Sequence, residues 1–334
     1  MSGSVICFGE MLLRLAAPGA GVLLQEPRLD AHIGGAEANV AVALARIGVP
    51  SAMVTILPDD ALGDAALAAI RAAGVDTSGI LRGEGRLGLY YLTPAAGNRP
   101  AAIIYDRLES LFARTPSEAY DWPRLLNGAS WLHLSGIIPA IGPHAAALSL
   151  DAIAAARAAG VRVSFDGNFR ASMWARWCPN PAPILREHVA GADLLIGNHR
   201  DVGLLLTREF AGDGQQRRRE AAEAAFAAFP QLRFMASTAR EVVTPQHHRL
   251  SARVDAADAF AETRAIDLTG IVDRIGTGDA FAAGVLARLD IGLEAAAETG
   301  LALAVLAHAT PGDQSFATAR DLAAFTAEGG DVRR

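Results

Sequence analysis

Residues 131–134 are WLHL and residues 145–165 are AAALSLDAIAAARAAGVRVSF, and these two segments decide the fold. Trp131–Leu134 and Val161–Phe165 are short apolar runs, which are typical of buried strands. Ala145–Ala159 is alanine-rich and long enough for a helix, and Gly160 stands where a glycine ends one. The segments therefore predict a strand–helix–strand unit with parallel strands.

The same alternation extends in both directions through the 334 residues. It predicts a doubly wound, mostly parallel α/β sheet. Gly48 and Gly74 mark two further helix ends. The other predicted strands are Val5–Phe8, Ala52–Leu57, Asp193–Ile196 and Leu232–Ala236, and the other predicted helices are Glu37–Ile47, Ala61–Ala73 and Arg217–Phe229.

Two stretches break the alternation, about residues 12–33 and about residues 86–107. Both are strand-like, with Gly and Pro between the strands and no intervening helix, and they predict a small β-sheet lid. We expect residues 1–334 to form one domain, with the rest of the chain as its α/β body. The run Gly83-x-Gly85-x-x-Gly88 matches the dinucleotide-binding pattern, but a strand-like segment follows it where a helix should begin. We interpret it as a turn into the lid.

The basic residues exclude several kinds of chemistry. All 30 are arginine, so the chain contains no lysine. A Walker-type phosphate-binding loop, a Schiff-base aldolase and a pyridoxal enzyme each require a lysine. The 36 acidic residues give a net charge of −6, and the one basic tract, Arg217–Arg219, lies in a predicted helix. We therefore expect no nucleic-acid partner.

Hydrophobic residues make up 51% of the chain, which argues against disorder. No apolar run approaches the ~20 residues of a membrane span. Residues 1–10 lack a basic start and are interpreted as a strand rather than a signal peptide. Cys7 and Cys178 have no metal-type spacing, which favours a cytoplasmic location, and His247-His248 lacks further zinc ligands nearby.

The run Gly276-Thr277-Gly278-Asp279 precedes a predicted helix. Its glycines allow consecutive N–H groups to gather at the helix N-terminus, where they form an anion cradle. A transferred phosphoryl group needs such donors. We expect Asp279 to be an exposed, ionised carboxylate that accepts the proton of an attacking hydroxyl. The alternative is a glycine-rich turn in which Asp279 only caps the helix.

The run Gly34-Gly35 opens another predicted helix, with Asn39 one turn further on. The two glycines allow the backbone to approach a polyol closely, and Asn39 has the groups to bind hydroxyls. The alternative is an ordinary helix start.

The two runs, in this order and near the two ends of the chain, resemble the signature regions of the PfkB/ribokinase family of carbohydrate kinases. The resemblance implies a ribokinase-like α/β fold with a β-sheet lid. It also implies ATP and Mg²⁺, and transfer of the γ-phosphoryl group to a primary hydroxyl. Asp279 would be the catalytic base, with Gly276, Thr277 and Gly278 around the transferred phosphate.

Further segments resemble the family members that phosphorylate 2-keto-3-deoxygluconate. These are Leu89-Tyr90, Tyr105-Asp106-Arg107, residues 165–170 and Thr238-Ala239-Arg240-Glu241. An arginine binds a C1 carboxylate in bidentate fashion, so two arginines favour a sugar acid over a neutral sugar. The alternative for both is a surface salt bridge. The resemblance implies sugar-acid contacts by Gly34, Gly35, Asn39, Tyr90, Tyr105, Arg107, Arg170 and Asp313 of Pro311-Gly312-Asp313.

The resemblance also places residues on the nucleotide side. Asn198-His199-Arg200-Asp201 stands where the family often has Asn-x-x-Glu, and Asp201 is the predicted magnesium ligand. The residues predicted to bind the nucleotide are Asn168, Asn198, Thr238, Arg240, Gly276 and Gly278.

Three alternatives stay open. The first is another kinase of the family, acting on fructose, ribose, a nucleoside or a different keto-deoxy acid, because the sequence does not fix the C4 configuration. The second is a non-catalytic sugar- or nucleotide-binding module. The third concerns assembly, since an exposed lid sheet would allow a homo-oligomer.

Overall fold

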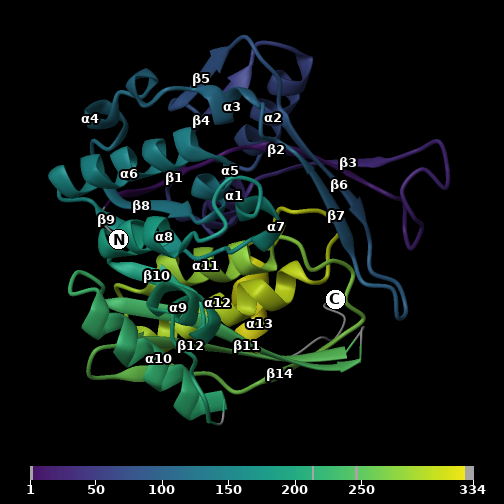
Figure 1. Cartoon of the computed structure of the whole chain (residues 1–334). Coiled ribbons are helices and arrows are strands. Elements are labelled where there is room, and N and C mark those ends of the chain that lie inside the picture. The colour runs from purple at the N-terminus through teal and green to yellow at the C-terminus, as the bar shows by residue number, and fades with distance from the viewer. Residues whose placement is uncertain (1–2, 213, 245–246, 328–334) are drawn as a thin grey trace.

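The computed structural model describes residues 3–212, 214–244 and 247–327, and its centre is one large sheet (Figure 1). The strand order is β5-β4-β1-β8-β9-β10-β11-β12-β13, and β14 also pairs with β12. Pairing is parallel from β5 through β11 and antiparallel beyond. The strands are β1 (Ser4–Phe8), β4 (Ser51–Pro58), β5 (Ile80–Gly83), β8 (Ala129–Ser135), β9 (Arg162–Asp166), β10 (Leu194–Ile196), β11 (Phe234–Thr244), β12 (His247–Ala256), β13 (Phe260–Glu262) and β14 (Ile266–Thr269).

All six predicted strands of the body are present, so the expected doubly wound sheet is confirmed. The main difference is β11, which continues to Thr244 where the prediction ended at Ala236. It does so because β12 pairs with it along its whole length. The polar segment after Ala236 is therefore held by backbone hydrogen bonds that apolar patterning does not predict.

Helices cover both faces of the large sheet. Alternate residues of β1 point to opposite faces, with Val5 and Cys7 in one buried cluster and Ile6 and Phe8 in the other. The first cluster is completed by α1 (Ala36–Arg46), α2 (Ala61–Ala72), α11 (Thr277–Arg288), α12 (Leu293–Ala307) and α13 (Ala319–Ala327). The second is completed by α3 (Leu111–Arg114), α4 (Trp122–Leu125), α5 (Ile137–Ile141), α6 (Pro143–Ala158), α7 (Ala171–Trp174), α8 (Ala182–Ala190), α9 (His199–Leu206) and α10 (Gly214–Ala228).

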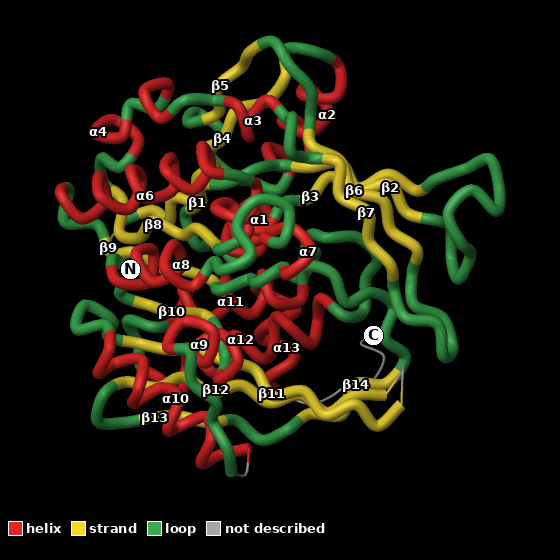
Figure 2. The backbone as a smooth tube through the Cα atoms, viewed as in Figure 1, coloured by secondary structure: helices red, strands yellow, loops and turns green. Residues whose placement is uncertain are grey.

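A separate small sheet has the order β3-β2-β6-β7. Its strands are β2 (Leu12–Ala16), β3 (Asp30–Gly34), β6 (Gly88–Thr93) and β7 (Ala102–Asp106), which lie inside the two stretches predicted to be strand-like. Figure 2 shows these strands projecting from the body, with long loops at their far ends. Tyr90 and Leu92 face Leu12 and Ala16 in a small buried cluster of their own.

Strand order reverses at β1, which lies between β4 and β8. In open α/β sheets, ligands bind in the crevice beyond the carboxyl ends of the strands at such a reversal. The small sheet begins next to the carboxyl end of β1, because the chain leaves β1 at Phe8 and enters β2 at Leu12. In the part of the chain that the structure describes, no helix is both long and apolar enough to cross a membrane.

Candidate active site

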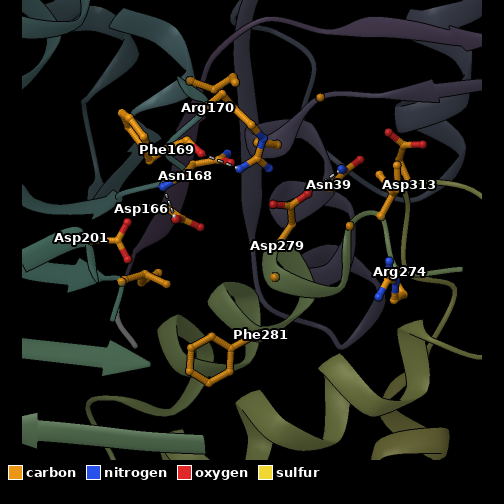
Figure 3. Close-up of a pocket in the computed structure, with 18 of the residues that line it drawn as sticks. Asn39, Asp166, Asn168, Phe169, Arg170, Asp201, Arg274, Asp279, Phe281 and Asp313 are labelled. Carbon is orange, nitrogen blue, oxygen red and sulfur yellow. Dashed lines mark hydrogen bonds between the residues drawn. The ribbon is translucent and has the colours of Figure 1, made fainter. Parts of the chain in front are cut away.

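A cavity of about 680 Å³ lies at the carboxyl ends of the strands, between the large and small sheets. It brings together most of the predicted site residues (Figure 3). The other three lie nearby: Thr277 and Arg240 line an adjoining cavity of about 380 Å³, and Gly34 ends β3. The predicted residues that line the larger cavity are Gly35, Asn39, Tyr90, Tyr105, Arg107, Asn168, Arg170, Asn198, Asp201, Thr238, Gly276, Gly278, Asp279 and Asp313.

The glycine-rich turn ends in the first turn of α11. Gly276 is the N-cap residue, with φ of 78°, and a Cβ there would lie 1.8 Å from the backbone oxygen of Asp313. Glycine is therefore required both by conformation and by space. No described side chain caps this helix, so its first N–H groups are left for a ligand. A Cβ at Gly278 would meet nothing within 4 Å, which leaves room for an anion.

Asp279 lies in the first turn of α11 and is half-buried. Burial raises its pKa to about 7, and a hydrogen bond from Asn39 partly opposes that rise. The expectation of an exposed carboxylate with an ordinary pKa is therefore wrong. A carboxyl group with a pKa near neutrality is well suited to accept a proton at physiological pH.

Asn39 sits in α1, and its Nδ2 donates to Oδ2 of Asp279 at 2.7 Å. The predicted hydroxyl-binding residue is thus the partner of the predicted base. Its Oδ1 is buried without a partner among the described residues. The contact joins two segments 240 residues apart, and Figure 3 shows it at the centre of the cavity.

The alternative interpretation of Arg107, a salt bridge at the protein surface, is wrong. Arg107 is 2% exposed, and its Nε and Nη2 lie 2.7 and 2.6 Å from Oε2 of Glu10. Glu10, which follows β1, is itself buried. Arg107 still lines the cavity, and the buried carboxylate holds its guanidinium in place.

Arg170 is exposed at the rim of the cavity, and no ion pair joins it to another described residue. In Figure 3 its guanidinium points toward Asp279. It follows β9, whose last residue, Asp166, also lines the cavity. Burial raises the pKa of Asp166 to about 8, and repulsion from Asp279 and Asp201 adds to the effect. Asn168 contacts this carboxylate through its backbone N–H.

A second buried acid, Glu37, lies in the first turn of α1. It accepts a hydrogen bond from Ser135 at 2.6 Å, and burial raises its pKa to about 7. The Ser135 hydroxyl also accepts a hydrogen bond from Nδ2 of Asn168, at 3.3 Å. Glu37 is thus linked to the cavity wall through two polar side chains.

Tyr90 and Asp313 are both buried, and they contact each other. The Tyr90 hydroxyl donates to Oδ2 of Asp313 at 2.5 Å. Arg14 of β2 donates to the other oxygen of Asp313 at 3.1 Å and to Asp273 at 2.7 Å. The two predicted sugar contacts therefore belong to a network that joins the small sheet to the loops before α11 and after α12.

The nucleotide-side residues begin α9. Asn198 is the N-cap of this helix, and the carboxylate of Asp201 accepts the Asn198 backbone N–H at 2.7 Å in a capping box. The contact that the structure shows for Asp201 is thus structural, and its magnesium role stays a prediction. Within residues 3–212, 214–244 and 247–327, no cluster of three or more acidic, histidine or cysteine side chains is arranged to hold a metal.

The adjoining cavity is rich in arginine. Arg200, Arg217 and Arg240 line it together with Thr238, and none of the three forms an ion pair with a described residue. Unpaired guanidinium groups around one cavity favour a phosphate-bearing ligand. The cavity also touches Thr277 and Gly278 and is thus continuous with the cradle of α11.

Sequence reasoning missed five polar residues here: Glu10, Arg14, Glu37, Asp166 and Asp273. Glu10 and Asp166 could have been predicted, because each follows a predicted strand and ligands bind beyond the carboxyl ends of such strands. Asp273 lies three residues before the Gly276–Asp279 run and was not singled out. Nothing local distinguishes Arg14 from an outward-facing arginine on a strand.

Comparison with known proteins agrees with this geometry. The chain matches the model described as pfkB family carbohydrate kinase over residues 2–320. A 2-dehydro-3-deoxygalactonokinase of Haloferax volcanii is 29% identical, with 95% of each chain covered. A 2-dehydro-3-deoxygluconokinase of Bacillus subtilis is 28% identical, covering 97% of this chain and 96% of the relative.

One solved structure matches this fold over nearly the whole chain. The crystal structure of 2-dehydro-3-deoxygluconokinase from Thermotoga maritima superposes with a TM-score of 0.92. It is 32% identical and covers 98% of this chain and 99% of that one. The resemblance predicted from the two glycine-rich runs is therefore confirmed, and the chain belongs to the pfkB family of carbohydrate kinases.

Proposed function

We propose that this kinase transfers the γ-phosphoryl group of ATP to the terminal hydroxyl of a small sugar acid, with 2-keto-3-deoxygluconate as the substrate and its 6-phosphate as the product. One observation carries the proposal. Asp279, with a pKa near 7, lies in the first turn of an uncapped helix and lines the same cavity as Arg107 and Arg170. A base, an anion cradle and two guanidinium groups thus surround one space.

The names of the relatives support an acidic substrate. Two relatives and one solved structure are named as kinases of 2-dehydro-3-deoxy sugar acids. These names differ in the sugar, gluconate or galactonate, which are epimers at C4. The galactonate-derived acid is therefore the competing substrate.

In the proposed reaction, the carboxylate of Asp279 accepts the proton of the substrate hydroxyl. The hydroxyl oxygen forms a bond to the γ-phosphorus, and the bond from that phosphorus to the β–γ bridging oxygen breaks, which releases ADP. The N–H groups at Gly276, Thr277 and Gly278 stabilise charge on the transferring oxygens. Arg107 and Arg170 hold the carboxylate end of the substrate.

ATP would occupy the arginine-lined cavity, with its γ-phosphate at the cradle. Asn198, Thr238 and Arg240 line this cavity, and Asn168 lines the wall of the larger one. Mg²⁺ binds phosphate oxygens and water, with one or two carboxylates. Asp166 fits that need, because burial and then repulsion from Asp279 and Asp201 raise its pKa, and a divalent cation would relieve that repulsion. Bound there, the ion would neutralise phosphate charge.

The small sheet would act as a lid. Tyr90 and Tyr105 lie on paired strands of this sheet, with ring centroids 6.3 Å apart, and both line the cavity. A sheet that covers the bound sugar excludes water, which would otherwise compete as the phosphoryl acceptor.

Release of ADP in the presence of single candidate acceptors tests the proposal. The panel is 2-keto-3-deoxygluconate, 2-keto-3-deoxygalactonate, fructose and ribose, each with MgATP. We expect the highest kcat/KM for the gluconate-derived acid. A higher value for the galactonate-derived acid would correct the substrate, and a preference for a neutral sugar would overturn the acidic-substrate proposal.

Two variants sharpen this test. Arg170→Gln should raise KM for the sugar acid about 10-fold or more while leaving KM for ATP nearly unchanged, since a charge-assisted hydrogen bond is worth about 1.5–3 kcal/mol. Arg186→Gln, an exposed arginine of α8 outside both cavities, is the matched control. Equal KM values in the two variants would remove Arg170 from the sugar-acid site.

A further inference from the structure

Arg14 connects the small sheet to the catalytic turn through buried ion pairs. It is 4% exposed, and its two terminal nitrogens bind different acids: Nη2 lies 2.7 Å from Asp273 and Nη1 lies 3.1 Å from Asp313. Arg14 belongs to β2, Asp273 precedes α11 and Asp313 follows α12. One side chain therefore ties three separate segments together.

Asp273 organises the backbone that leads into the cradle. Its Oδ1 accepts the N–H groups of Arg274 at 2.7 Å and Ile275 at 3.0 Å. Its Oδ2, which receives Arg14, also accepts the N–H of Gly312 at 3.2 Å. The orientation of this carboxylate thus determines the path of the chain immediately before Gly276.

Asp313 packs against both glycine-rich runs. A Cβ at Gly34 would lie 2.3 Å from its carboxylate, and a Cβ at Gly276 would lie 1.8 Å from its backbone oxygen. Its second carboxylate oxygen accepts the Tyr90 hydroxyl. A shift of Asp313 would therefore disturb the sugar side and the phosphate side of the cavity together.

Arg14 does not line the cavity that contains Asp279. It lines a different hollow together with Asp273 and Arg274. Its effect must pass through the two acids that it pairs. We propose that Arg14 is a positioning residue that couples the placement of the small sheet to the geometry of the Gly276–Asp279 turn, for the phosphoryl transfer proposed above.

The guanidinium shape is needed for this role. Two nitrogens of a rigid planar fork reach two carboxylates at once, whereas an ammonium is a single compact charge. A lysine at this position would keep the charge but would not hold both acids in the same geometry. The proposal therefore distinguishes positioning from simple neutralisation of buried charge.

The test compares Arg14→Met, Arg14→Lys and Arg28→Met in the full chain. Arg28 is a matched control, because it also pairs with an aspartate of the small sheet, Asp30, but its side chain is 66% exposed. The first readout is hydrogen exchange at the amides of Arg274, Ile275 and Gly312, which needs no turnover. The second is kcat and KM with MgATP and the best acceptor from the panel.

We expect faster exchange at those three amides and a fall in kcat of about 100-fold in Arg14→Met, the scale of a misplacement of about 1 Å at a reacting centre. Arg14→Lys should recover part of both effects, and Arg28→Met should match the unmodified chain. If Arg14→Met does not fold, Arg14→Lys decides the outcome.

Unchanged exchange at these amides in Arg14→Met would overturn the proposal, as would wild-type kcat and exchange in Arg14→Lys. If the unmodified chain phosphorylates no member of the panel, the proposed function fails. The exchange measurement would still test the positioning role, so the two failures are distinguishable.

Discussion

Replacing Asn39 with leucine should move the pH dependence of catalysis in a direction that the structure fixes. The Asn39 amide donates to the Asp279 carboxylate at 2.7 Å and therefore stabilises its ionised form. Leucine has a similar volume and no donor, so Asn39→Leu should raise the pKa of Asp279. The base must be ionised to accept a proton, and the acidic limb of the rate profile should move to higher pH.

The size of the shift follows from the kind of hydrogen bond. A hydrogen bond to a charged group contributes about 1.5–3 kcal/mol. At 1.36 kcal/mol for each pKa unit, the limb should move up by about 1–2 pH units. Because the pKa of Asp279 is about 7, kcat at pH 7 should fall by about 5- to 50-fold and should recover largely at higher pH.

The assay is kcat at saturating sugar acid and MgATP, measured from pH 5.5 to 9.5. Saturation separates the pKa effect from any loss of sugar affinity, since Asn39 also lines the cavity. Asn127→Leu, at an exposed loop position, is the control and should leave the profile in place. An acidic limb that stays at the same pH in Asn39→Leu, or moves to lower pH, would show that the Asn39 hydrogen bond does not lower the pKa of Asp279.

Three further variants test separate parts of the account. Gly276→Ala should lower both kcat and the melting temperature, because its Cβ would lie 1.8 Å from the Asp313 backbone oxygen, and wild-type values of both would show that the turn accepts a side chain. Burial raises the pKa of Glu37 from 4.5 to about 7, so the stability that this group contributes is present below about pH 4.5 and lost as pH rises through about 7. Between pH 5 and pH 8.5 the free energy of unfolding from urea titrations should fall by about 2.5 kcal/mol less in Glu37→Gln than in the unmodified chain, and equal falls would contradict the assignment. Asp201→Ala should lower the free energy of unfolding by about 1 kcal/mol through loss of the capping box, and a higher Mg²⁺ requirement in this variant would support its predicted magnesium role as well.

Much of the fold could be predicted from the sequence, because hydrophobic periodicity reports burial directly. The strands of the body are apolar runs between alanine-rich helices, and each of the six predicted ones is present. The far half of β11, its antiparallel partner β12, and the strands β13 and β14 that pair with β12 were not predicted. Their residues are polar at many positions, and they become strands through pairing with each other rather than through a pattern of their own.

Two parts of the candidate site could be predicted from the spacing of glycines. The runs at Gly34 and Gly276 identified the two backbone turns, and the structure places them on either side of Asp313. The partners of the charged residues were not predictable. The pairing of Arg107 with Glu10 joins residues 97 positions apart, and only the fold brings them together.

The raised pKa of Asp279 could not be predicted from the sequence either. A carboxylate beside two glycines looks exposed in a one-dimensional pattern. Its desolvation depends on α1, which brings Asn39 against it from the other end of the chain. The same is true of Glu37, whose raised pKa follows from its complete burial.

The turnover of Asp279→Asn on 2-keto-3-deoxygluconate, measured as ADP release at saturating MgATP, tests whether Asp279 is the catalytic base. Asparagine keeps the size of the side chain but cannot accept the proton as a carboxylate does. We expect a loss of about 10²–10⁴ in kcat with ATP binding retained. A rate close to that of the unmodified chain would show that Asp279 is not the catalytic base.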